Sequence, residues 1–516
     1  MKYSEEKTNL TWKLLLGSLI VCAVVLRLIL MKKWLVLYCD DDQTLMWNAT
    51  AAYGHFMIPE PFFWGQSYGV MFESFVAVPM YWLGVPLNAA LPAATILLSI
   101  AAYLFVSFLL AKKGHFKFAC AVMASYLLMS WRWDILTSVP RCYISGMSLA
   151  VLGSIWINTA ETKRNVLCAA FLCMAAVIMT NSAAVIAGIG YLYFVLNANG
   201  NCKKIPALLG GSVCGFVLYL LLRNFYVINA EYNLHPSPAL VFSSEVLRAN
   251  IRRIPYLLSD FSFLDNGWVV LMLLALALIY VFLSKHWKTL LLLVGDIFLM
   301  LFLMAMRKTA NYSDNSVTFS QTRMFLCWTY SLLPIVCFWT EEKASKTGSG
   351  SRFDVTGFFG KRYVQTLVCL SVLMIAVGAN VMKLDKLDAD LLNPASRLRN
   401  GYAANCFSTR DVMKTCAEIN EKAELVNADT VVTGDRRALS YAFDALYFGK
   451  YTVYNCVYDR RTWNYIAMTQ ARDRRCLFIN GIAYDPIAYE TIDFDRDGGT
   501  SAVQYFKENY GYNRRP

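Results

Sequence analysis

Apolar runs long enough to cross a lipid bilayer recur through most of the first 382 residues of this chain. The hydrocarbon core of a membrane is about 30 Å thick, and an α-helix crosses it in roughly 20 residues. The chain has 516 residues, of which 57% are hydrophobic and only 16% are charged. Soluble domains rarely combine these features. The sequence therefore predicts a polytopic α-helical membrane protein.

The positions of Lys and Arg orient the predicted helices. The net charge of +12 would indicate a nucleic-acid partner in a soluble domain. In a membrane protein, basic residues collect in the cytoplasmic loops, so we expect no nucleic acid. The apolar run Val70–Val85 is short and contains Glu73. If it crossed the membrane, Lys113 and Lys117 would lie outside, whereas a helix lying in the interface leaves them inside, as the positive-inside rule favours.

This choice gives about eleven spans and one interfacial helix. The predicted spans are Leu10–Leu30, Leu91–Ala111, Phe118–Met129, Tyr143–Ile157, Val166–Met179, Ala183–Leu196, Pro206–Leu222, Trp268–Leu283, Thr289–Met306, Met324–Trp339 and Tyr363–Met382. The first span is too long for a signal peptide and lacks a small-residue cleavage site, so we expect a retained anchor. Residues 1–382 would form the transmembrane domain, with the amino end in the cytoplasm and residues 31–90 as the first extracytoplasmic loop.

Residues 383–516 have shorter apolar runs and more charge. Short β-type runs alternate there with helical stretches, which predicts a small extracytoplasmic α/β domain. The predicted strands are Thr430–Thr433, Tyr451–Tyr454 and Cys476–Ile479, and the predicted helices are Asp411–Leu425 and Leu439–Phe448. Four cysteines of this region can form disulfides if the domain is oxidised: Cys406, Cys416, Cys456 and Cys476. The sequence leaves their pairing open.

Three consecutive carboxylates, Asp40, Asp41 and Asp42, follow the first span. Like charges repel one another, so a metal ion, a basic partner or an acceptor that gives up a proton would stabilise the group. The alternative is that they begin the helix Thr44–Tyr53, since carboxylates favour the first turn of a helix. If a divalent metal binds here, the candidate ligands are Asp41, Asp42 and His55.

An aromatic stretch, Pro61-Phe-Phe-Trp-Gly-Gln-Ser-Tyr-Gly-Val-Met-Phe-Glu73, follows in the same loop. It contains the polar residues Gln66 and Tyr68, and Glu73 lies on an otherwise apolar helix. Aromatic surfaces with a few polar groups suit sugar rings, which present C–H faces and hydroxyls. The alternative is an aromatic belt at the membrane interface.

Together these two stretches resemble the GT-C superfamily of membrane glycosyltransferases, across roughly residues 10–160. The shared pattern is a first span, an acidic pair opening the outer loop, Phe-Trp-Gly-Gln-x-Tyr-Gly with a downstream Glu, then Trp-Leu-Gly and a Leu-Pro that opens the next span. The nearer relatives are the group of protein O-mannosyltransferases and the lipid A aminoarabinose transferase. The resemblance implies an undecaprenyl- or dolichyl-phosphate sugar donor, an outer-face active site and an outer-loop Asp that acts on the acceptor. The sugar and the acceptor stay open.

The resemblance also suggests individual site residues. Asp41 with Asp42 fits the family's acidic pair best, because of the following Gln-x-x-x-Trp, and Asp40 is not excluded. A second acidic residue in the next outer loop corresponds to Asp134; the alternative is a local ion pair with Arg132 or Arg141.

Two arginines at the outer ends of spans, Arg141 and Arg323, are candidate binders of the donor phosphate, because guanidinium forks match phosphate oxygens. The alternative for each is a side chain that extends to the interface, which is also what we expect of Arg27.

The main rival function is a transporter or flippase of a lipid-linked sugar. Such a protein needs charged or interrupted spans at the membrane centre, and Asp296 is the only strong intramembrane charge in the predicted spans. A non-catalytic assembly protein is a third possibility. The family's distribution favours a bacterial plasma membrane.

The topology has a direct test. A Lys113→Cys variant should not react with a membrane-impermeant thiol reagent added outside intact cells, because the predicted loop is cytoplasmic. Efficient external labelling would make Val70–Val85 a span and invert much of the map.

Overall fold

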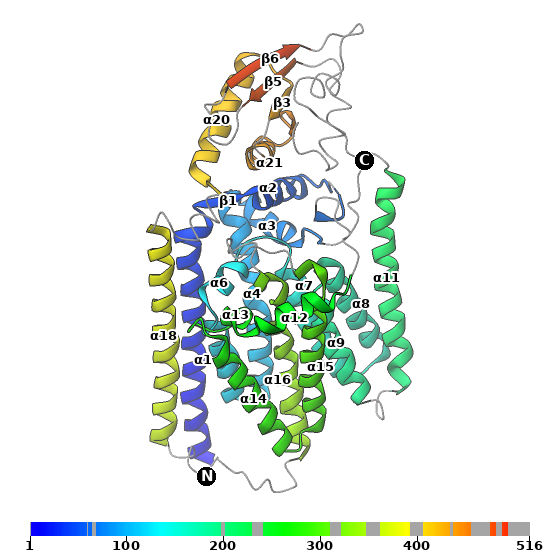
Figure 1. The fold of residues 1–516 in the computed structure, drawn as a ribbon, viewed down its shortest axis with the longest axis vertical. Coiled ribbons are helices and arrows are strands. Elements are labelled where there is room, and N and C mark those ends of the chain that lie inside the picture. The colour runs from blue at the N-terminus through cyan, green and yellow to red at the C-terminus, as the bar shows by residue number, and fades with distance from the viewer. Residues whose placement is uncertain are drawn as a thin grey trace.

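The computed structural model describes residues 2–58, 60–63, 69–197, 202–229, 241–309, 321–346, 362–392, 406–433, 437–455, 475–480 and 488–493. Long helices run side by side along one axis, and a small domain with a β-sheet lies at one end of them (Figure 1). We call this the domain end. The amino terminus lies at the opposite end.

Helices make up most of the described part of the chain. They are α1 (Lys2–Leu30), α2 (Asp41–Gly54), α3 (Phe72–Trp82), α4 (Leu87–Lys112), α5 (Phe116–Leu127), α6 (Trp131–Leu136), α7 (Ile144–Thr159), α8 (Lys163–Met179), α9 (Ala183–Leu196), α11 (Ile205–Ile228), α12 (Ser244–Arg252), α13 (Ile254–Ser259), α14 (Gly267–Leu283), α15 (Trp287–Met304), α16 (Cys327–Lys346) and α18 (Arg362–Leu392). A π-helical turn, Met31–Leu35, continues α1. The short helices α12 and α13 were not predicted from the sequence.

Six helical stretches in the described part of the chain are long and apolar enough to cross a membrane. They are Leu10–Leu35, Leu87–Lys112, Cys202–Ile228, Trp287–Met304, Arg323–Lys343 and Val364–Ala389. The shorter helices α5, α7, α9 and α14 are also apolar. These helices confirm an integral membrane protein; the total of about eleven spans stays a prediction.

The run predicted to lie in the interface forms α3, which has only 11 residues. At 1.5 Å per residue it is about 17 Å long, too short to cross the hydrocarbon core. Gly84 follows α3 with a φ of +78°, a conformation that glycine adopts without strain. Pro86 then begins α4 as its N-cap residue.

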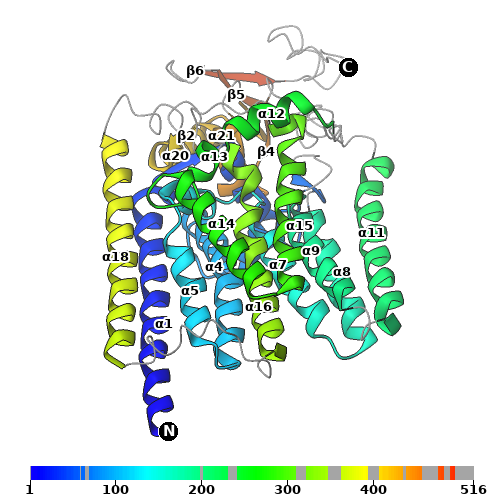
Figure 2. The ribbon, with the colours of Figure 1, turned by 60° about the horizontal axis from the view of Figure 1, so that its bottom comes forward.

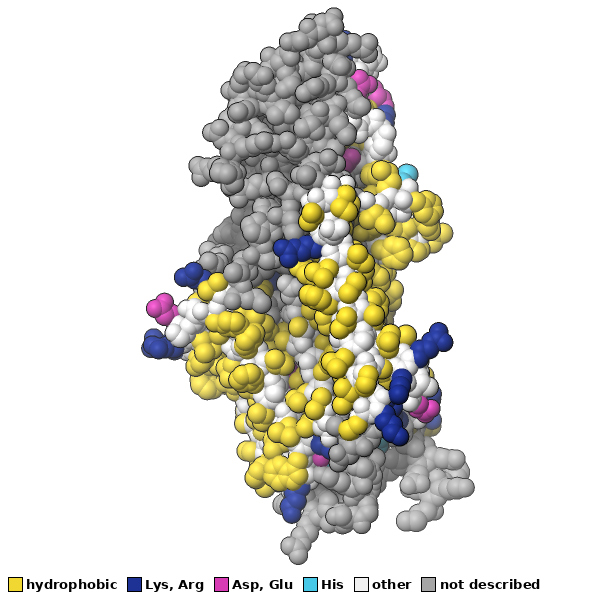
Figure 3. Space-filling view, turned by 90° about the vertical axis from the view of Figure 1, so that its right-hand side faces the viewer, with side chains coloured by type: hydrophobic (Ala, Val, Ile, Leu, Met, Phe, Trp, Pro, Cys, Tyr) yellow, Lys and Arg dark blue, Asp and Glu magenta, His cyan; other side chains and the backbone are white. Residues whose placement is uncertain are grey.

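The helices pack closely where small residues face neighbouring backbone. A Cβ atom on Gly211 of α11 would lie 2.2 Å from the carbonyl oxygen of Leu167 on α8, so only glycine allows this approach. Outer faces remain apolar: Leu209, Val213, Phe216 and Leu220 of α11 are exposed. Hydrophobic side chains cover much of this side of the bundle in Figure 3, as expected for a surface that contacts lipid.

The domain end carries a four-stranded sheet with the strand order β4-β3-β5-β6. Its elements are α20 (Thr409–Leu425), β3 (Thr430–Thr433), α21 (Arg437–Leu446), β4 (Thr452–Asn455), β5 (Arg475–Asn480) and β6 (Ala488–Asp493). Strand β3 is parallel to β4 and to β5, whereas β6 is antiparallel to β5. The α/β prediction is confirmed, and β6 is a strand that the sequence analysis missed.

The side chains of Cys416 and Cys476 are buried. Cys456 and the side chain of Cys406 lie outside the described residues. The disulfide pairings left open by the sequence therefore remain open.

The C-terminal domain is joined directly to the segment after the first span. Strand β1 (Tyr38–Asp40) pairs antiparallel with β2 (Cys406–Ser408), with Asp40 opposite Cys406. Helix α2 packs against α21, where Asn48 donates a hydrogen bond to Asp444. The stretch that carries the three aspartates therefore lies between the membrane helices and the sheet domain (Figure 1).

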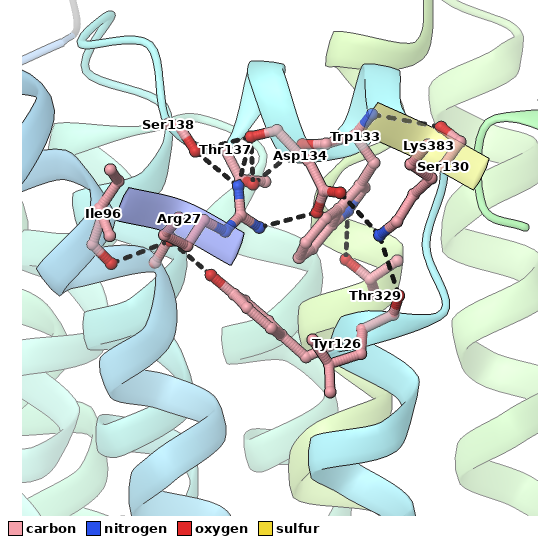
Figure 4. A network of polar contacts seen from close by, with 12 residues as sticks. Arg27, Ile96, Tyr126, Ser130, Trp133, Asp134, Thr137, Ser138, Thr329 and Lys383 are labelled. Atoms are coloured by element: carbon pink, nitrogen blue, oxygen red, sulfur yellow. Dashed lines mark hydrogen bonds and ion pairs between the residues drawn. The ribbon is translucent and has the colours of Figure 1, made fainter. Parts of the chain in front are cut away.

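Three buried charges tie α1, α6 and α18 together (Figure 4). Asp134 accepts a hydrogen bond from Arg27 at 3.0 Å through one oxygen and from Lys383 at 2.7 Å through the other. Each of the three side chains is at most 2% exposed. The Arg27 guanidinium also lies 4.7 Å from the ring centre of Tyr126, a cation–π contact. The expectation that Arg27 extends to the membrane interface is therefore wrong.

Lys383 lies on a helix that is longer than the predicted last span. Helix α18 continues to Leu392, ten residues beyond the predicted end of the span at Met382. The Lys383 ammonium group donates a second hydrogen bond to the carbonyl oxygen of Leu127, at 2.9 Å. Figures 1 and 2 both place α18 beside α1 at one edge of the bundle, with α11 at the opposite edge.

The buried triad generates a stability prediction. Asp134→Asn should lower the free energy of unfolding in detergent by about 3–5 kcal/mol, because two buried cations lose their counter-ion. Lys33 and Asp388 form an exposed ion pair between the ends of the same two long helices. A Lys33→Gln control should cost less than about 1 kcal/mol. Equal losses in the two variants would contradict the structural role of the triad.

Candidate functional site

Asp40 ends strand β1 and begins helix α2. Its side chain accepts a hydrogen bond from the backbone N–H of Gln43 at 2.9 Å, which makes it the N-cap residue of α2. Such a bond satisfies one of the unpaired N–H groups at the start of a helix. Asp41 and Asp42 occupy the first turn. The helix-start alternative left open by the sequence thus describes Asp40, which is only 2% exposed.

Arg141 lies between two of the three aspartates. Its Nη2 donates to Asp40, and its Nη1 donates to Asp42 at 2.7 Å. The Arg141 side chain is 2% exposed, and the Asp42 side chain 20%. The partner of the acidic cluster is therefore a basic residue of the chain itself, about 100 residues away, in the segment between α6 and α7.

Glu73 holds the backbone of the Arg141 segment. It is fully buried in the first turn of α3. One of its oxygens accepts hydrogen bonds from the backbone N–H groups of Arg141 at 3.0 Å and Cys142 at 3.1 Å. Burial raises the pKa of the Glu73 carboxyl to about 7, although hydrogen bonds from backbone N–H groups, that of Cys142 first, oppose the shift.

The same segment has a strained backbone at Cys142. Its φ is +59°, in the left-handed region, which costs a residue with a side chain about 1 kcal/mol or more. Two contacts hold it there: its N–H binds Glu73, and its carbonyl oxygen accepts a 2.7 Å hydrogen bond from Thr180. Strain of this kind persists where surrounding contacts fix the backbone, which is common at functional sites.

The aromatic stretch of the first loop is anchored on both sides. The hydroxyl of Tyr226, near the end of α11, donates to Glu60 at 2.9 Å and accepts from the N–H of Phe62 at 3.1 Å. Further along the stretch, the N–H of Gly69 donates to the carbonyl oxygen of Ile178 at 3.2 Å. The predicted sugar contacts Gln66 and Tyr68 lie between these anchors, outside the described residues.

Arg323 lies beside the Arg141 segment. It occupies a 3₁₀ turn before α16 and donates to the hydroxyl of Tyr143 at 3.3 Å. Tyr143 is two residues after Arg141 in the chain. One segment therefore carries Arg141 and contacts Arg323 through Tyr143.

Asp134 is not part of this cluster. Its two oxygens bind Arg27 and Lys383, and Arg132 pairs with Asp260 instead, at 3.3 Å. The local ion pair with Arg132 or Arg141, which was the alternative, is thus replaced by a buried pairing with Arg27 and Lys383. This pairing gives Asp134 a structural role, and its substrate-binding role stays a prediction.

The proposed metal ligands are not brought together. His55 is the C-cap residue of α2 and stacks on Phe448 of the C-terminal domain. Asp41 and Asp42 begin this helix, and its 14 residues place His55 about 20 Å from them. Within the described residues, no group of three His, Cys, Asp or Glu side chains is placed to hold a metal ion.

Three residues of this region escaped the sequence analysis: Glu60, Tyr226 and Lys383. A signal existed for Glu60, a carboxylate between two prolines in an aromatic loop. No local pattern marks Tyr226, since its partner lies 166 residues away.

The position of Glu73 generates a prediction. Glu73→Ala leaves two buried N–H groups without an acceptor and should cost about 2–4 kcal/mol of stability, whereas Glu73→Gln keeps an acceptor oxygen and should cost less. The raised pKa adds a pH dependence. The folded protein keeps this proton up to about pH 7, so the stability of the wild type relative to Glu73→Gln should fall as pH rises from about 4.5 to 7. Unfolding curves in detergent across this range test it, and parallel curves for the two proteins would contradict it.

No protein-family model and no curated protein matches the sequence. Among solved structures, the chain is similar to ArnT from Cupriavidus metallidurans bound to undecaprenyl phosphate, with 10% identity, a TM-score of 0.51, and coverage of 89% of this chain and 92% of that one. It is also similar to the Archaeoglobus fulgidus oligosaccharyltransferase in the apo form, with 12% identity, a TM-score of 0.42, and coverage of 84% and 63%. The second likeness is too weak to carry an argument. The first bears on the fold and confirms the predicted fold class: the chain has an ArnT-like fold.

Proposed function

We propose that the protein is a membrane glycosyltransferase that moves a sugar from a polyprenyl-phosphate carrier to an acceptor at the domain end. The observation that carries this proposal is the cluster of Arg141 with Asp40 and Asp42, in a chain with an ArnT-like fold. A guanidinium can bind the donor's phosphate, and a carboxylate can accept the acceptor's proton. The bound undecaprenyl phosphate of the ArnT structure supports a donor of this class.

The reaction needs one bond to form and one to break. The acceptor's hydroxyl or amine attacks the anomeric carbon of the sugar, and its proton passes to a carboxylate. The bond between that carbon and the phosphate oxygen breaks, and the electron pair leaves with the polyprenyl phosphate. Because the leaving phosphate carries charge that cations stabilise, the step needs no general acid, in contrast to glycoside hydrolysis.

The described residues suggest a role for each part of the site. Asp41 and Asp42 are the candidate bases, because Asp40 already caps α2. Arg141 and Arg323 would bind the phosphate. Glu73 would position Arg141 through its backbone rather than contact the substrate.

Gln66 and Tyr68 keep their proposed role as sugar contacts. The packing of α21 on α2 suits a C-terminal domain that recognises the acceptor or covers the site. We propose that the protein lies in a bacterial plasma membrane and that its domain end faces away from the cytoplasm.

The rival transporter function would rely on Asp296. This residue is 1% exposed in α15, which packs against α9 and α16. A hydrogen bond to a neighbouring helix accounts for such a carboxylate, and nothing about its position favours transport.

The catalytic role has a direct test. Asp41→Asn and Asp42→Asn should each leave the protein folded, and loss of the base should reduce transfer of a radiolabelled sugar from undecaprenyl phosphate by about 10²-fold or more. Asp388→Asn removes one carboxylate at the same end of the bundle and serves as a charge-matched control with normal activity expected. Full transfer activity in both variants would show that neither aspartate is the base.

A further inference from the structure

Arg141 faces two carboxylates in the structure. The terminal nitrogens of its guanidinium donate to them, Nη2 to Asp40 and Nη1 to Asp42. A phosphate that binds end-on through both Nη1 and Nη2 would compete with these carboxylates. For Arg141 to bind the donor in this way, at least one of the carboxylate contacts has to open.

The two carboxylates differ in how firmly they are held. Asp40 is 4% exposed as a side chain, caps α2 through the N–H of Gln43 and lies in the β1–β2 ladder. Asp42 lies in the first turn of α2 rather than at its N-cap, and its side chain is 20% exposed. The contact that can open at lower cost is therefore the one between Arg141 and Asp42.

Hydrogen bonds hold the backbone of the Arg141 segment. Glu73 binds the N–H of Arg141 and the N–H of Cys142, and Thr180 binds the carbonyl oxygen of Cys142. Tyr143 of the same segment accepts a hydrogen bond from Arg323, so a second cation contacts this segment.

We propose that Arg141 exchanges partners: it neutralises Asp42 in the resting protein, and the donor's phosphate draws it away and releases Asp42 as the base. This inference rests on the proposed function and adds the order in which donor binding and proton transfer occur. A carboxylate that loses its cationic partner becomes a better proton acceptor. Asp42 then takes the proton of the attacking acceptor, and Arg141 stabilises the phosphate that leaves. The base is active only when the donor is bound.

The exchange predicts that one substitution in the site strengthens donor binding instead of weakening it. Asp42→Asn removes the resting partner of Arg141, so the full-length protein in detergent should bind undecaprenyl phosphate more tightly, by about tenfold. Part of any gain comes simply from removing a negative charge near an anion. A double-mutant cycle separates the two effects. In the background of Arg141→Gln, the same Asp42→Asn change should alter the affinity only slightly.

The controls keep the inference distinct from the proposed function. If the wild type binds undecaprenyl phosphate no more tightly than phosphatidic acid, the proposed function fails. If the wild type binds but Asp42→Asn gives the same gain in both backgrounds, or no gain, the exchange is wrong and the proposed function stands. Because Arg141→Gln leaves two acidic side chains together, Arg141→Lys provides a second background that keeps the charge and loses the fork. Thermal unfolding of each variant verifies that it is folded.

Discussion

The ion pairs between Arg141 and the aspartates Asp40 and Asp42 organise the domain end of the molecule. They fasten the first turn of α2 to the segment between α6 and α7. Helix α2 also packs against α21, and β1 pairs with β2. The C-terminal domain is therefore connected to the same cluster. Buried charges of this kind are costly unless each is paired, so the membrane helices and the soluble domain must meet in one arrangement.

The sequence predicted the fold where local patterns determine it. Apolar length identified the membrane helices, basic loops separated α3 from the spans, and β3 was predicted with its observed bounds. The triad of Arg27, Asp134 and Lys383 could not be predicted, because its partners are 107 and 249 residues apart in the chain. A single charge near a span end has the same local pattern whether it extends to the interface or pairs in the interior.

The candidate site, too, could be predicted only where local patterns mark its residues. The Asp triplet and the arginines were visible as unusual residues near the ends of predicted spans, yet their pairing was not. A local ion pair with Arg132 or Arg141 was the alternative to a site role for Asp134, whereas Arg141 contacts Asp40 and Asp42, and Arg132 contacts Asp260. Capping by Asp40 sharpens the choice among the three aspartates, since a side chain already committed to a helix start is a poor candidate for proton transfer.

The most direct measurement is an experimental structure of the full chain with undecaprenyl phosphate bound. The account predicts phosphate oxygens within hydrogen-bond distance of the Arg141 guanidinium, with Asp42 released and Asp40 still capping α2. A phosphate bound elsewhere, with Arg141 still held between Asp40 and Asp42, would contradict it.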